Sequence, residues 1–163
     1  MPTATYEKIE AKTLGSAATS VTFSSISGAY TDLILIVSSS NTLGSFYDNL
    51  LTFNGDTGSN YSWTRITGTG SAASSARGSS QTAIQVGWSG PAMTNNIIQI
   101  QNYSNSTTYK TTIARTNDAA SNVAASVGLW RNTAAITSLT LTQFTGSSFN
   151  SGSTFTLYGI KAA

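Results

Sequence analysis

The chain has 163 residues and contains neither cysteine nor histidine. Charged residues make up 9% of it, against about a quarter of an average globular domain, and the formal net charge is only +2. This composition excludes disulfides, thiolate metal sites, imidazole acid–base chemistry and serine-protease-type triads. The six acids are scattered and do not indicate a glycosidase pair. We therefore expect no enzyme activity, no cofactor and no bound metal.

Serine and threonine fill much of the remaining sequence, with 26 of each among the 163 residues. The length and the 39% of hydrophobic residues predict one folded domain, residues 1–163, with enough apolar side chains for a core. The eight basic residues form no run, so we expect no nucleic-acid binding. The longest aliphatic run, residues 33–37, is far too short for a membrane span, so we expect no membrane contact.

The first predicted element lies near the N-terminus, where residues 7–12 hold the only charge cluster. Its alternation is typical of an edge strand, because charges at a sheet edge discourage aggregation. The alternative is an N-terminal strand or arm, about residues 1–15, that pairs with another subunit. Tyr6 and Ile9 are its candidate contact residues.

Period-two alternation of apolar and polar residues continues along the chain, and turn residues separate the alternating runs. Residues 33–37 are apolar on both faces, which predicts an interior strand of a sheet covered on both sides. Residues 50–53 have a similar pattern. About eleven strands are expected in all, which predicts an all-β fold, a jelly-roll-like antiparallel β-sandwich.

Residues 67–80 interrupt this pattern, because none of the fourteen has a bulky apolar side chain. We expect a flexible loop here, either a mobile tip or an arm that orders against a neighbouring subunit. Arg77, within this segment, is a candidate contact residue. Arg131 is another, since it follows Trp130 and alternates outward; it either caps an interface or is a solvated surface charge.

Two further features have a structural and a functional interpretation. Residues 54–60 resemble a calcium loop in their oxygen-bearing side chains, but Asp56 is their only carboxylate, so a tight hairpin turn is favoured. Trp63 and Trp88 share a face with aliphatic residues of their strands, which favours core packing. The alternative is a platform of aromatic rings that stack on sugars.

Three stretches, in this order, carry a family resemblance. Residues 21–26 and 30–35 of the N-terminal part read VTFSSI and YTDLIL, and residues 53–61 read FNGDTGSNY. Residues 149–160, after Trp130, read FNSGSTFTLYGI. Together they resemble a group of tailed-bacteriophage virion proteins described as capsid decoration (cement) proteins, head fibres and tail-fibre domains.

The resemblance implies a non-catalytic β-sandwich that often assembles as a homotrimer. It leads us to expect a capsid decoration protein on the outer surface of the virion, which binds the major capsid protein and stabilises the shell by bridging capsomers. The alternative is a tail or baseplate appendage, or a receptor-binding domain, that contacts host surface glycans. The chain lacks the coiled-coil heptads and Gly-X-Y repeats of a long fibre, which favours decoration.

Overall fold

The computed structural model describes residues 5–118 and 121–161 and consists mostly of β-strands. The twelve strands are β1 (Tyr6–Thr13), β2 (Ser20–Phe23), β3 (Asp32–Ser39), β4 (Tyr47–Phe53), β5 (Tyr61–Gly68), β6 (Ala73–Gln81), β7 (Ile84–Ser89), β8 (Thr94–Gln101), β9 (Lys110–Asp118), β10 (Val123–Trp130), β11 (Leu139–Gln143) and β12 (Thr154–Ile160). A single-turn 3-10 helix, η1 (Phe144–Gly146), follows β11.

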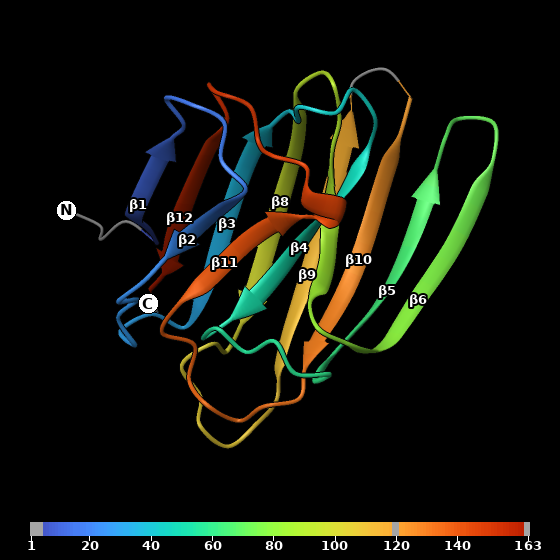
Figure 1. Cartoon of the computed structure of the whole chain (residues 1–163). Coiled ribbons are helices and arrows are strands. Elements are labelled where there is room, and N and C mark those ends of the chain that lie inside the picture. Colours follow the sequence, from blue (N-terminus) through green and yellow to red (C-terminus); the bar gives the residue numbers. More distant parts are fainter. Residues whose placement is uncertain (1–4, 119–120, 162–163) are drawn as a thin grey trace.

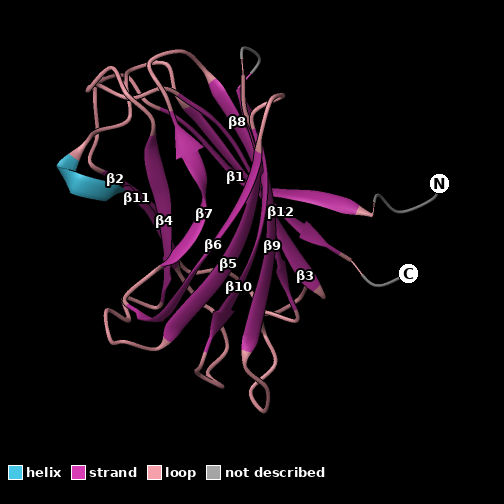
Figure 2. Ribbon diagram, turned by 90° about the vertical axis from the view of Figure 1, so that its right-hand side faces the viewer, coloured by secondary structure: helices cyan, strands magenta, loops and turns pink. Residues whose placement is uncertain are grey.

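These strands form two sheets packed face to face (Figures 1 and 2). The large sheet has eight strands in the order β1-β12-β3-β8-β9-β10-β5-β6, and the small sheet has four in the order β2-β11-β4-β7. All neighbouring strands are antiparallel. The expected all-β antiparallel sandwich is confirmed, with twelve strands where the sequence indicated about eleven.

The hydrophobic core lies between the sheets, where alternate residues of each strand meet. In β3, Leu33, Leu35 and Val37 are fully buried against the small sheet. This strand pairs with β12 and β8, as expected for an interior strand. However, the expectation of cover on both sides is wrong, because the small sheet packs on one face only and Ile36, on the other face, is 40% exposed.

Aromatic residues fill one end of the core. Trp130 is fully buried, stacks on Tyr61 with ring centroids 6.2 Å apart, and packs against Phe53 at 5.5 Å. Trp88 is buried, and Trp63 is partly buried against the core. Core packing, favoured over a flat sugar platform, is therefore confirmed for Trp63. Trp88 is buried but does not belong to the core cluster; it packs against Phe46 instead.

The charged N-terminal segment is an edge strand, as predicted. β1 pairs only with β12 and carries a β-bulge between Lys8 and Glu10, a device that twists an edge away from further pairing. The Glu7 carboxylate forms an ion pair with Lys161. Residues 1–4 of the expected arm lie outside the described residues.

The expectation of a flexible loop at residues 67–80 is wrong. β5 continues to Gly68, and residues 73–81 form β6, which pairs along its length with β5. β6 is the second edge of the large sheet and extends past the small sheet, at the right of Figure 1. Because no layer covers it, every side chain of β6 is exposed, and only the backbone of Gly78 is half-buried, so a strand forms here without core residues.

β7 of the small sheet packs closely over β10 of the large sheet. A Cβ atom at Gly128 of β10 would lie 2.4 Å from Ile84 Cγ2 of β7, so only glycine fits this position. The inward residues of β10 before it, Ala124 and Ser126, are also small and buried. The valines that alternate with these small residues, Val123 and Val127, consequently lie on the opposite, outer face of the large sheet.

Candidate functional site

The outer face of the large sheet has no covering layer among the described residues (Figure 2). It nevertheless carries many apolar side chains. We call this surface the outer face. Six of the eleven exposed large hydrophobic side chains of the described residues lie on it: Tyr6, Ile36, Ile66, Ile113, Val123 and Val127, with exposures from 40% to 61%. The strand register places all six on the same face of the large sheet, because directly paired residues on neighbouring strands point to the same face.

Three shallow hollows follow one another across the outer face. The first, of about 690 Å³, lies over the tips of β5, β6 and β10 and is lined by Ile66 and Val123. The second, of about 570 Å³, lies between Arg77 and Ile113, and the third, of about 260 Å³, lies near β1 at Tyr6. An uneven apolar surface of this extent is typical of protein–protein contact sites rather than of free solvent-facing sheets.

The charged side chains of the outer face are mostly positive. It carries Lys8, Arg77 and Arg115, and none of these cations forms an ion pair among the described residues. Among the described side chains, the one carboxylate on this side is that of Asp32 at the start of β3, whose Oδ1 accepts a hydrogen bond from the Asn102 N–H at 2.6 Å. The surface therefore suits a partner that offers apolar side chains and carboxylates.

The structure places the four candidate contact residues in different environments. Tyr6 and Arg77 both lie on the outer face, although they belong to its opposite edges, β1 and β6. Ile9 is half-buried and packs against the core. Arg131 follows β10 and donates hydrogen bonds to Ser62 Oγ at 3.1 Å and to the Tyr61 carbonyl at 3.2 Å.

The central apolar residues of the outer face were missed by the sequence reasoning. In β10 the large aliphatic Val123 and Val127 alternate with Ala124, Ser126 and glycine, so hydrophobicity alone places the valines inside. What identifies the two valines as outward residues is the small size of the residues that alternate with them. A run of small side chains on one face marks the close approach of a second sheet and assigns the larger apolar residues to the other face.

The turn at residues 54–60 is closed by hydrogen bonds to Asp56. Its carboxylate accepts bonds from Trp130 Nε1 at 2.7 Å, Asn60 Nδ2 at 3.0 Å and the Gly58 N–H at 2.8 Å. The Trp130 bond, with smaller contributions from the others, lowers the pKa of the Asp56 carboxyl despite the opposing effect of burial. The predicted tight turn is thus fixed to the aromatic end of the core.

Within residues 5–118 and 121–161 no three His, Cys, Asp or Glu side chains lie close enough together to hold a metal ion. In the same ranges, no helix has the length and apolar character needed to cross a membrane. Comparison with protein-family models, curated proteins and solved structures found no match.

Proposed function

We propose that this protein is a capsid decoration protein of a tailed bacteriophage, which docks through its outer face on the outer surface of the shell. The observation that supports docking is the uncovered apolar surface with its unpaired cations. The nature of the partner, the major capsid protein, is proposed from the resemblance in residues 21–35, 53–61 and 149–160. The role is structural, without catalysis or cofactor.

The physical basis of docking is burial of the exposed apolar side chains. Covering one half-exposed valine such as Val127, 54% exposed in the free protein, contributes about 1 kcal/mol. Several such residues lie together on each copy, flanked by Arg77 and Arg115, which would pair with carboxylates of the shell. Binding of many copies to the assembled shell and not to its separated subunits stabilises the shell by mass action.

We also propose that the protein acts as a homotrimer, in accordance with the family resemblance. A trimer would place three outer faces on neighbouring capsomers and so bridge them. Cross-linking followed by mass measurement should give a species of three times 17.0 kDa. A persistent 17.0 kDa monomer at high concentration would contradict the trimer without affecting the docking face.

Docking is tested with shells assembled from the major capsid protein encoded in the same genome. The wild-type chain should co-sediment with these shells and raise their melting temperature. Val127→Asp places a carboxylate in the centre of the outer face and should weaken binding at least about tenfold, because the charge would be buried on docking.

The matched control is Ser20→Asp, which adds the same charge to an exposed residue of β2 in the small sheet. It should bind as the wild type does. Equal binding of Val127→Asp and wild type would refute docking through this face. Failure of the folded wild-type chain to bind any shell would refute the capsid role itself.

A further inference from the structure

A second hollow surface lies on the other side of the molecule, at the edge of the small sheet. It is a cleft of about 530 Å³ between β4 and β7 on one side and β5 on the other, closed at one end by η1. We call it the aromatic cleft, after the rings of Phe46, Trp88 and Phe144 that line it. Its volume falls within the roughly 300–1,000 Å³ range of small-ligand sites.

Two of the three rings are open to solvent. Phe46 is 48% exposed and Phe144 is 52% exposed, whereas Trp88 is buried behind them. Trp88 meets Phe46 edge to face, with centroids 6.5 Å apart and planes at 81°. Phe46 is also supported by Gly90, where a Cβ atom would lie 2.4 Å from its ring. The Phe46 ring is therefore held in position with part of its surface free.

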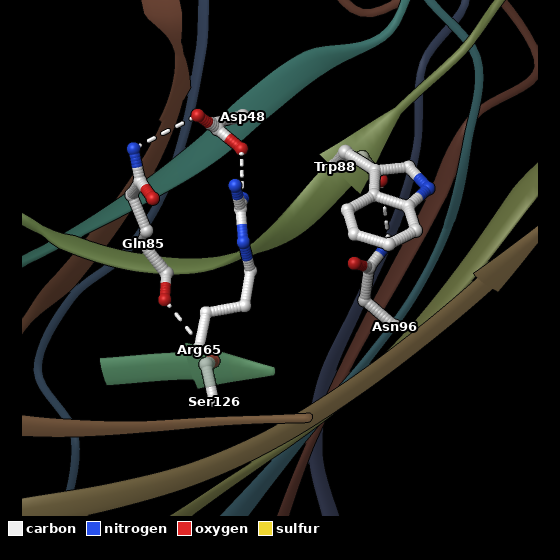
Figure 3. Close-up of polar contacts among 6 residues, drawn as sticks. All are labelled: Asp48, Arg65, Gln85, Trp88, Asn96 and Ser126. Carbon is white, nitrogen blue, oxygen red and sulfur yellow. Dashed lines mark hydrogen bonds and ion pairs between the residues drawn. The ribbon is translucent and has the colours of Figure 1, made fainter. Parts of the chain in front are cut away.

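An oriented ion pair forms the polar wall of the aromatic cleft (Figure 3). Asp48 Oδ1 lies 2.6 Å from Arg65 Nη1, and Asp48 Oδ2 accepts a hydrogen bond from Gln85 Nε2 at 2.8 Å. The Arg65 and Asp48 side chains are 20% and 25% exposed, so both reach the solvent in the cleft. Arg65 also lies beside Trp88, with its guanidinium carbon 5.9 Å from the indole centroid.

Two donors of residues that line the aromatic cleft have no acceptor among the described residues. Arg65 Nε and Trp88 Nε1 are buried and make no hydrogen bond among the described residues. Trp88 is only 6% exposed, so its indole N–H cannot be satisfied by bulk water. Buried donors are nearly always paired in native proteins, so each of these exceptions needs an explanation, and a bound molecule is one.

We propose that the aromatic cleft binds an uncharged pyranose ring of a glycan. The C–H face of a pyranose is apolar and flat enough to lie on an open aromatic ring, while its hydroxyls both donate and accept hydrogen bonds. Asp48 supplies acceptors and Arg65 supplies donors to such hydroxyls. Because the two charges compensate each other, the cleft selects a neutral ligand rather than an anion or a cation.

This site is independent of the proposed docking function. In Figure 2, η1 lies on the side of the small sheet, away from the outer face, so docking would leave the aromatic cleft open. A chain bound to a larger particle through its outer face would present the cleft to the surroundings. Failure of one function in an experiment would not bear on the other.

Saturation-transfer NMR on the full chain tests the proposal, with the methyl glycosides of galactose, glucose, mannose and N-acetylglucosamine as separate probes. At least one should receive magnetisation, most strongly at ring C–H protons. Phe46→Ala and Phe144→Ala remove rings from two separate segments of the chain. Each should weaken the affinity for that glycoside at least about tenfold. Both side chains are half-exposed, so circular dichroism should show the wild-type fold.

The control is Tyr109→Ala, which removes an aromatic ring, 55% exposed, that does not line the cleft. It should leave probe binding unchanged. Absence of transfer to all four glycosides would overturn the proposal. So would binding that both phenylalanine variants retain, or binding of benzyl alcohol without any glycoside, which would show an apolar pocket and no sugar site.

Discussion

The hydroxyl of Tyr61 gives the most quantitative test of the fold. Tyr61 is fully buried and stacks on Trp130 at the aromatic end of the core. Its hydroxyl accepts a hydrogen bond from the Phe53 N–H at 3.1 Å and donates one to the Asp56 carbonyl at 2.9 Å. The pairing of β4 with β7 ends at Leu51, so the hydroxyl takes the place of a strand partner for Phe53.

Tyr61→Phe removes this hydroxyl and leaves the ring packing in place. The buried Phe53 N–H then has no acceptor on that side, which costs about 1–3 kcal/mol of the free energy of unfolding. The same variant changes the pH dependence of stability. Burial raises the pKa of Tyr61 to about 12, whereas an unfolded tyrosine titrates near 10.

The sign of this effect follows from proton binding. Between about pH 10 and 12 the folded chain keeps the Tyr61 proton that the unfolded chain releases, so stability falls as pH rises. With pKa values of about 12 and 10, the loss at about pH 11 amounts to about 1.4 kcal/mol. Below about pH 10 the contribution is fully present. Tyr61→Phe lacks this loss, so the stability gap between wild type and variant should narrow by about that amount.

Urea unfolding followed by circular dichroism, at about pH 8 and about pH 11, measures both effects. The remaining tyrosines are common to the wild type and the variant, so their contributions cancel from the difference. Tyr109→Phe, at an exposed position, serves as the control and should show no gap at either pH. A Tyr61→Phe gap that is absent at neutral pH, or that stays constant up to about pH 11, would refute the reasoning.

Two further predictions concern the inner face of the large sheet. Lys110 is fully buried, and burial lowers its pKa; its Nζ donates to the carbonyls of Thr108 and Thr133 at 2.7 and 3.0 Å. The folded chain thus releases this proton before the unfolded chain does, so stability should rise as pH approaches about 10, and Lys110→Met should lack that rise in urea titrations. A variant with the wild-type pH profile would contradict this. Gly128→Ala would place a Cβ atom 2.4 Å from Ile84 Cγ2 of β7 and should cost about 1–3 kcal/mol in thermal unfolding, whereas Gly68→Ala, with its nearest neighbour at 3.6 Å, should cost much less. Equal losses at the two glycines would show that β7 does not approach β10 as closely as described.

The sequence predicted the fold class because period-two alternation reports the burial of one face of a strand. It failed for β6, whose residues 73–81 are small and polar, because this strand is stabilised by backbone pairing with β5 and buries almost no side chain. No hydrophobic pattern marks an edge strand that extends past the opposite sheet. β3 is the opposite case. Its residues are apolar on both faces, which predicted cover on both sides, but its second face belongs to the open outer face.

The candidate sites were predicted only in part. Tyr6 and Arg77 do lie on the outer face. The outward valines of β10 were missed because the face of β10 that meets the core depends on how closely β7 packs over it, which is a tertiary contact. The aromatic cleft combines residues 46–48 with Arg65, Trp88 and Phe144, which lie far apart in the sequence and form no motif. Phe46, Arg65 and Phe144 meet only because β5 extends past the edge of the small sheet.

Hydroxyl-radical footprinting of the free and shell-bound protein measures most directly which surface docks. If the outer face binds the shell, side-chain oxidation should fall at Ile66, Ile113 and Val127, which are 61%, 43% and 54% exposed in the free chain. Phe144, 52% exposed on the side of the small sheet, should be oxidised equally in both states. Protection of Phe144 with unchanged oxidation of the three outer-face residues would contradict the account and assign docking to the opposite side.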